Sequence, residues 1–208
     1  MAAIEAVIFD IGNVLIEWHP ERMYDRAVGQ DRRKALWDAV DLEAMNRRVD
    51  LGEEIAEVVA ECASAHPEFA EDILLWHRNW LDMLQPDIPG TALVLRALRN
   101  RGVPVFALSN FGVSTLALAD RHYPVLTEFD RRFVSGHLRV MKPDPAIYAH
   151  VEADTGIAPE RLFFIDDRLE NIAAAARRGW QTHHFEGPRG LAVRLVREEL
   201  LQPSEVPD

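Results

Sequence analysis

The sequence predicts an α/β fold, namely a Rossmann-like, mostly parallel sheet with helices on both faces and an inserted helical cap subdomain. From residue 86 onward, short apolar runs alternate with helical stretches, as in strands joined by crossover helices. Between residues 18 and 85, apolar residues recur at helical spacing and no strand is convincing. We therefore expect a core domain of residues 1–17 and 86–202, a cap of residues 18–85 and a frayed tail at 203–208.

The first strand is predicted at residues 7–9, where Val-Ile-Phe runs directly into Asp10. Gly12 and Asn13 follow, which indicates a buried strand that ends at a sharp turn with an acid on its tip. An acid in that position is a nucleophile or a metal ligand, or it only caps the next turn. This stretch alone leaves both interpretations open.

Helices fill the predicted cap, and four of the five tryptophans lie in or beside it, namely Trp18, Trp37, Trp76 and Trp80. Their spacing places them on helix faces with other apolar residues. Core packing and the lining of a substrate pocket are both compatible with that placement.

The predicted core continues with alternating elements. We expect strands at 103–108, 133–135, 162–165 and 181–185, helices at 91–101, 113–121, 169–178 and 191–201, a turn at 136–137, and a helix beginning at Asp144-Pro145.

Composition limits the partners. The chain has 208 residues, and its 34 acidic residues against 23 Lys and Arg give a formal charge of -11, which argues against nucleic acid and anionic membranes. No apolar run has the length of a membrane span, and the single cysteine, Cys62, fits a reducing compartment. We expect a cytoplasmic protein that acts on a small molecule.

Polar residues follow the predicted strands at the sheet edge where ligands bind in such folds. These are Asp10, then Ser109 and Asn110, then Lys142 after the short strand, and finally Asp166 and Asp167. Carboxylates brought together raise one another's pKa unless a cation lies among them, and ligation by oxygen alone favours Mg²⁺. No Cys or His cluster has zinc spacing, and the His183-His184 pair is expected to be structural or at the surface.

Such a site suits a phosphoryl group. A cation would neutralise its oxygens, the hydroxyl, amide and lysine would surround it, and a carboxylate would attack in line. Ser109 and Asn110 also precede a predicted helix, whose backbone N–H groups near Gly112 would add to an anion site.

The ordered set of four stretches resembles the sequence motifs of the haloacid dehalogenase-like (HAD) hydrolase superfamily. The matching stretches are Phe9 to Val14, Leu108-Ser109-Asn110, Met141-Lys142-Pro143 and Phe164 to Asp167, and the helical insertion resembles that superfamily's α-helical cap. The resemblance spans nearly the whole chain. Within the superfamily, the chain is similar to bacterial sugar-phosphate phosphatases of the glucose 1-phosphate type.

The resemblance implies phosphoryl transfer through an aspartyl phosphate on Asp10. Ser109 and Asn110 would hold the phosphoryl oxygens, and Lys142 would neutralise charge on the nucleophile and the phosphate. Mg²⁺ would be held by the Asp10 carboxylate, the Gly12 backbone carbonyl and the acidic pair, with Asp167 as a direct ligand and Asp166 as a direct or water-mediated one.

Gly12 departs from the common phosphatase pattern, which has a second Asp at this position as general acid. General acid–base help is worth roughly 100- to 10,000-fold, so the gap fits an easier leaving group, such as the anomeric oxygen of a sugar 1-phosphate, or a proton donor elsewhere, either a cap residue or water. The gap also fits the haloacid dehalogenases, which use the same Asp without metal but do not need both Asp166 and Asp167. A third possibility is a non-catalytic phosphosugar-binding protein.

Candidate substrate contacts in the cap are residues nearest the first motif, among them Trp18 and Arg22, and the polar turn at residues 46–52, which contains Arg47. The alternative for each is a solvated helix end or a hinge of the cap.

Overall fold

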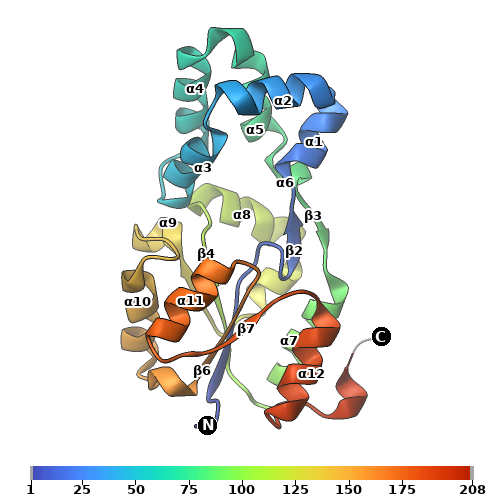
Figure 1. Cartoon of the computed structure of the whole chain (residues 1–208), viewed down its shortest axis with the longest axis vertical. Helices are drawn as coiled ribbons and strands as arrows, with labels where there is room; N and C mark the ends of the chain where they lie inside the picture. The colour runs from blue at the N-terminus through green and yellow to red at the C-terminus, as the bar shows by residue number, and fades with distance from the viewer. Residues whose placement is uncertain (1, 207–208) are drawn as a thin grey trace.

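The computed structural model describes residues 2–206. A parallel sheet of five strands lies at the centre of the lower part of the molecule (Figure 1), in the order β5-β4-β1-β6-β7. Its strands are β1 (Ala6–Phe9), β4 (Val105–Ser109), β5 (Arg131–Val134), β6 (Leu162–Asp166) and β7 (Gln181–His184). The prediction of an α/β fold with a mostly parallel sheet is confirmed.

Helices form the upper part of the molecule in Figure 1 and flank the sheet in the lower part. The upper helices are α1 (Pro20–Ala27), α2 (Gln30–Ala39), α3 (Leu42–Asp50), α4 (Ile55–Ala65), α5 (Ala70–Arg78) and α6 (Trp80–Met83). The lower helices are α7 (Pro89–Asn100), α8 (Val113–His122), α9 (Ser135–Leu138), α10 (Pro145–Thr155), α11 (Leu169–Arg177) and α12 (Pro188–Arg197). Short 3₁₀ helices lie at Pro67–Phe69, Pro124–Thr127, Pro159–Arg161 and Pro203–Glu205.

The three central strands, β1, β4 and β6, are buried along their whole length because both faces of the sheet are covered. The edge strands β5 and β7 are more polar and less buried. In β1, Ala6 and Ile8 belong to the cluster that includes buried residues of α10 and α11. Val7 and Phe9 point to the other face and belong to the cluster that includes residues of α7, α8 and α12. Alternate residues therefore serve two cores, one on each side of the sheet.

Strand register brings the carboxyl ends of the central strands together. Phe9 at the end of β1 pairs with Ala107 of β4 on one side and with Ile165 of β6 on the other. The residues that follow these positions therefore emerge at one edge of the sheet, beneath the upper helices (Figure 1).

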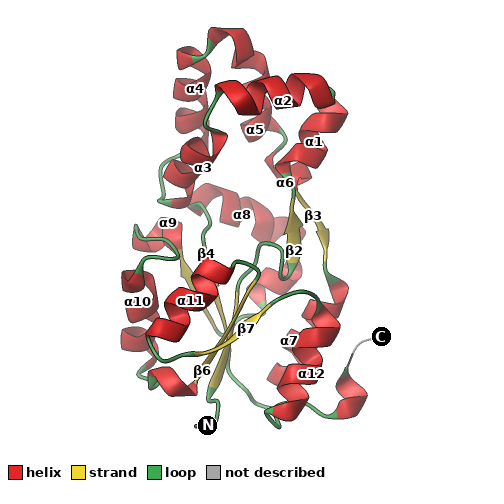
Figure 2. Ribbon diagram, in the orientation of Figure 1, coloured by secondary structure: helices red, strands yellow, loops and turns green. Residues whose placement is uncertain are grey.

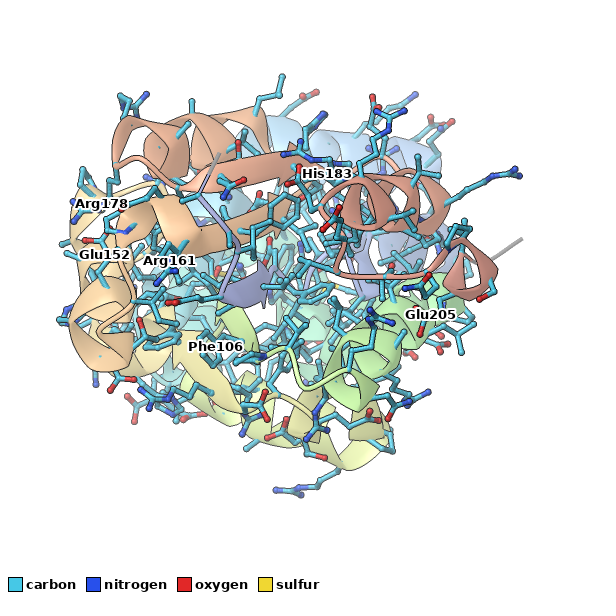
Figure 3. The ribbon with its side chains drawn as sticks, turned by 90° about the horizontal axis from the view of Figure 1, so that it is seen from below. Phe106, Glu152, Arg161, Arg178, His183 and Glu205 are labelled. Atoms are coloured by element: carbon cyan, nitrogen blue, oxygen red, sulfur yellow. The ribbon has the colours of Figure 1, made fainter. Side chains whose placement is uncertain are left out.

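The opposite end of the molecule, seen from below in Figure 3, is closed by polar contacts. Glu152 of α10 accepts hydrogen bonds from Arg178 at 2.6 and 2.8 Å and from Trp180 Nε1 at 2.8 Å. The partly buried Glu152 carboxylate is thus paired with hydrogen-bond donors from Arg178 and Trp180.

The predicted boundary between core and cap coincides with a small antiparallel ribbon that the sequence did not indicate. Its strands are β2 (Ile16–Trp18) and β3 (Leu84–Asp87), which connect the two parts of the molecule (Figure 2). The division into residues 1–17 with 86–202 and residues 18–85 stays a prediction.

Two local predictions were wrong. The turn expected at residues 136–137 is part of α9, a helical segment that ends where Arg139 adopts a left-handed φ of 59°. The tail expected to be frayed forms a 3₁₀ helix at Pro203–Glu205, where the Glu205 carboxylate accepts a hydrogen bond from the backbone N–H of Gln202 at 2.6 Å. Pro207 and Asp208 lie outside the described residues. No helix within residues 2–206 combines the length and apolarity needed to span a bilayer.

Candidate active site

Asp10 lies at the tip of β1 and is almost completely buried. Its Oδ1 accepts hydrogen bonds from the backbone N–H of Ile11 and from Ser109 Oγ, both at 2.7 Å, and lies 2.9 Å from Lys142 Nζ. Burial raises the pKa of Asp10 to about 7 despite the attraction of Lys142, and the charge of Asp166 raises it further. The carboxyl is thus fixed in position, and its charge is not fully compensated.

Lys142 bridges two strand ends. Its ammonium lies 2.7 Å from Asp166 Oδ2 as well as 2.9 Å from Asp10 Oδ1, and its side chain is buried. Burial alone would lower the pKa of Lys142, but the two carboxylates outweigh that effect and raise it. Lys142 therefore stays charged between them.

Asp166 is completely buried, and both of its oxygens are occupied by protein donors. Oδ1 accepts from the Arg168 N–H at 2.8 Å and from Asn171 Nδ2 at 2.9 Å, and Oδ2 accepts from Asn171 at 3.0 Å and from Lys142 at 2.7 Å. These contacts fix the Asp166 carboxylate in place, and Asp166 in turn positions the Lys142 ammonium.

Asp167 is less buried than Asp166 and has fewer donors. Asn13 Nδ2 donates to its Oδ2 at 3.1 Å, and His184 Nε2 lies 2.9 Å from its backbone oxygen. Burial raises the pKa of the Asp167 carboxyl, while the hydrogen bond from Asn13 opposes that rise. Asn13 itself is held because its Oδ1 accepts the Trp18 N–H at 2.8 Å.

Asn110 braces the loop that carries Lys142. Its Nδ2 donates to the Lys142 carbonyl at 2.9 Å, and its Oδ1 accepts the Lys142 N–H at 2.8 Å. One hydrogen of the amide remains for another acceptor.

A cavity of about 790 Å³ lies above these residues, between the sheet edge and the upper helices. Of the residues predicted to act, its lining includes Asp10, Gly12, Trp18, Arg47, Ser109, Asn110, Lys142 and Asp167. Arg22 does not line it, because its guanidinium pairs with Glu17 at 2.6 Å and donates to the Gln85 carbonyl. The tryptophans divide between two roles, since Trp18 and Trp80 line the cavity while Trp76 packs in the cap core.

The acids at the sheet edge suit a cation. Asp10, Asp166 and Asp167 each offer an oxygen, and these oxygens lie within 4.8 Å of one another. Within residues 2–206, Lys142 is the only positive side chain that lies within 4 Å of any of these carboxylates, so the negative charge is in excess. Mg²⁺ prefers carboxylate oxygens as ligands. Asp167, which accepts fewer hydrogen bonds than Asp166, has the carboxylate more available for such an ion.

Three further residues build this site. Sequence reasoning gave no separate role to Asn13 or Asn171, which hold the two acids of the Asp166-Asp167 pair. It included Asp50 only within the polar turn at residues 46–52, and Asp50, at the end of α3, lines the cavity from above. Burial raises the pKa of Asp50 to about 7, and the charge of Asp10 adds to that effect while Lys142 opposes it. The sequence allowed for a proton donor in the cap in place of an acid at position 12, but it gave no signal that picks out Asp50.

Relatives of known activity include both phosphatases and dehalogenases. The sesquiterpene phosphatase astK of Aspergillus oryzae is 29% identical over 198 residues, which cover 92% of this chain and 94% of the relative. Haloacetate dehalogenase H-2 of Moraxella sp. is 28% identical over 193 residues, covering 87% and 85% of the two chains.

The fold also recurs in solved structures. A HAD-family enzyme from Bacteroides thetaiotaomicron, in complex with magnesium and inorganic phosphate, matches with a TM-score of 0.70 at 22% identity. The match covers 89% of this chain and 96% of that one. A family model of haloacid dehalogenase-like hydrolases matches residues 4–179. The chain therefore belongs to the haloacid dehalogenase-like hydrolases.

Proposed function

We propose that this hydrolase is a Mg²⁺-dependent phosphatase that hydrolyses small phosphate monoesters, with sugar phosphates as the substrate class, through an aspartyl phosphate on Asp10. The observation that carries the proposal is the cluster of Asp10, Asp166 and Asp167, with Lys142 between the first two, beside a cavity that Asp10, Lys142 and Asp167 line. Phosphatases among the relatives support the same reaction class.

Asp10 is the proposed nucleophile. Its Oδ1 accepts the hydrogen bonds from Ile11 and Ser109, so the side chain cannot rotate freely. A fixed carboxylate at the cavity floor is oriented for in-line attack on phosphorus.

Ser109, Asn110 and Lys142 would receive the phosphoryl group. The Ser109 hydroxyl now donates to Asp10 and would be released to a phosphoryl oxygen once Asp10 forms its bond to phosphorus. Asn110 has its remaining amide hydrogen for the same group, and Lys142 balances the charge because Asp166 holds its ammonium.

Mg²⁺ would be held by the Asp10 carboxylate, the Gly12 carbonyl and Asp167. Because both oxygens of Asp166 already accept protein hydrogen bonds, we assign Asp166 to positioning Lys142 rather than to direct ligation. When bound, the ion supplies charge neutralisation for the phosphoryl oxygens.

The cap surface of the cavity would contact the rest of the substrate. Trp18 offers an aromatic face to the substrate, and Arg47 offers a positive charge. Arg22 forms an ion pair with Glu17 and would contact the substrate only if that ion pair breaks. A polar substrate of sugar size fits this mixed lining and the volume of about 790 Å³. The cytoplasm remains the proposed location.

The second candidate is a 2-haloacid dehalogenase, which the Moraxella relative and the glycine at position 12 favour. A panel of sugar phosphates, aryl phosphates and 2-haloacids, assayed with Mg²⁺ and with chelator, separates the two. The proposal expects phosphate release that chelator abolishes. Release of halide without phosphate release would make the protein a dehalogenase, and turnover of neither class would favour a non-catalytic phosphosugar-binding protein.

A further inference from the structure

Phosphate monoester hydrolysis needs a proton for the leaving oxygen, and the strand-end residues do not supply one. Position 12 holds glycine, and a side chain there would meet only Trp18 Cβ, at 4.0 Å. Packing therefore does not require the glycine. Lys142 is locked between two carboxylates, and Ser109 donates to Asp10.

In-line displacement determines the position of the group that protonates the leaving oxygen. The nucleophile and the leaving oxygen occupy opposite sides of the phosphorus. Because Asp10 attacks from the sheet edge, the leaving oxygen faces the cap, and an acid on the cap surface of the cavity is in position to protonate it. Asp50 is an acid on that surface, at the last turn of α3.

The core holds Asp50 in place. The Ser135 hydroxyl, on α9, donates to the Asp50 carbonyl at 2.5 Å and also accepts the Phe111 N–H at 2.9 Å. Arg139 donates to the Leu51 carbonyl at 3.3 Å, so the end of α3 is fixed to the same loops that build the phosphate site. The position of Asp50 is thus coupled to the reacting centre and not only to the cap.

The Asp50 carboxyl has one occupied and one available oxygen. Oδ2 accepts a hydrogen bond from Asn46 at 3.0 Å, whereas Oδ1 accepts none from any donor within residues 2–206. The charged groups that line the cavity with it are Glu43 and Arg47 on its own helix and, on the core, Asp10, Arg139, Lys142, Asp144, Asp167, Arg168 and Glu170. Burial and the Asp10 charge raise the pKa of Asp50 to about 7, so both its acid and its carboxylate forms are populated at neutral pH.

We infer that Asp50 is the general acid and base of this enzyme, in place of the acid missing at Gly12; the inference rests on the proposed phosphatase function. In the first step an Asp10 oxygen bonds to phosphorus, the ester P–O bond breaks, and its electron pair takes the proton of Asp50, so that the alcohol leaves. In the second step water attacks phosphorus and gives a proton to the Asp50 carboxylate. The Asp10–phosphorus bond breaks, and phosphate and the original acid are restored.

The test compares esters that differ in leaving-group basicity. The Asp50→Asn variant and the wild type are assayed for kcat/KM on an alkyl phosphate, such as a sugar phosphate, and on 4-nitrophenyl phosphate, whose leaving group needs no proton. The expected loss is roughly 100- to 10,000-fold for the alkyl ester and less than about 10-fold for the aryl ester. Glu57→Gln, which removes one exposed acid of α4, is the matched control and leaves both values within about 2-fold.

Two further variants keep the test decisive. Asp50→Glu retains an acid and is expected to recover part of the alkyl-ester activity, and Gly12→Asp in the Asp50→Asn background is expected to do the same from the other position. An equal loss on both esters, or no loss on either, overturns the inference in an active phosphatase. A wild-type enzyme that hydrolyses no phosphate ester overturns the proposed function itself, and the inference with it.

Discussion

At the scale of single residues, the charge of Lys142 determines whether the buried acids can coexist. Asp10 and Asp166 lie 2.9 and 2.7 Å from its ammonium, in a place with almost no water. Removal of one partner from a buried ion pair leaves the other charge uncompensated, which costs far more than the loss of an exposed pair. Lys142 therefore serves both stability and the chemistry proposed for Asp10.

This predicts a pH-dependent loss of stability in Lys142→Met without metal. In the wild type the pKa of Asp10 is raised from 3.8 to about 7, so ionisation of Asp10 removes stability as the pH rises across that interval. Without Lys142 the pKa of Asp10 rises further, and ionisation of the buried Asp10 carboxyl destabilises the fold more. Urea denaturation in chelator is expected to show a loss of about 3 to 5 kcal/mol at pH 8, and a smaller loss at pH 5, where Asp10 is protonated.

Lys34→Met is the control, since Lys34 is exposed on α2 and has no ion pair among the described residues. Its stability should match the wild type at both pH values. A Lys142→Met variant with equal losses at pH 5 and pH 8 would show that charge compensation is not the role of this lysine.

At the scale of elements, the contact between α3 and α9 joins the cap to the core. Gly52 follows α3 with a φ of +92°, and a Cβ there would overlap the Gly136 carbonyl oxygen of α9. The absence of a side chain at Gly52 thus lets the two backbones approach closely. The hydrogen bond from Ser135 to the Asp50 carbonyl depends on that approach.

Substitution of Gly52 by alanine tests this contact. Gly29→Ala is the matched control, because Gly29 also lies in the cap with a φ of +82° but has nothing within 4 Å of its added Cβ. Both variants carry the backbone strain, so the difference between them isolates the contact with α9. Gly52→Ala should lose about 1 to 3 kcal/mol more in urea denaturation, together with a larger fall in kcat/KM. Equal effects of the two substitutions would mean that the close approach does not position the site.

At the scale of the whole molecule, the sequence predicted the centre of the sheet and the residues at its edge because each of the strands β1, β4 and β6 is an apolar run that leads into a polar residue. Asp10, Ser109 and Asp166 lie beyond or at such ends, and parallel strands align them. The partners of these residues depend on packing instead. Asn171 reaches Asp166 only because α11 turns back over β6, and Asp50 reaches the cavity only because the cap docks on α9.

Short elements were also beyond the reach of sequence patterns. Strands β2 and β3 have three and four residues, and Pro86 interrupts the second, so no period can be read from them. The helical turn at Ser135–Leu138 contains Gly136, which by itself indicates a turn. Its helical form is held by the Gly136 N–H donating to the Phe111 carbonyl at 3.1 Å, a contact between distant segments.

The central claim is that Asp10 becomes phosphorylated during turnover. The most direct measurement is an acid quench of the enzyme turning over a ³²P-labelled sugar phosphate in Mg²⁺, followed by peptide mapping of the bound label. The predicted result is label on the peptide that contains Asp10, lost in Asp10→Asn and cleaved by hydroxylamine. Rapid ester hydrolysis with no label on the chain, or with label on another residue, would contradict the account.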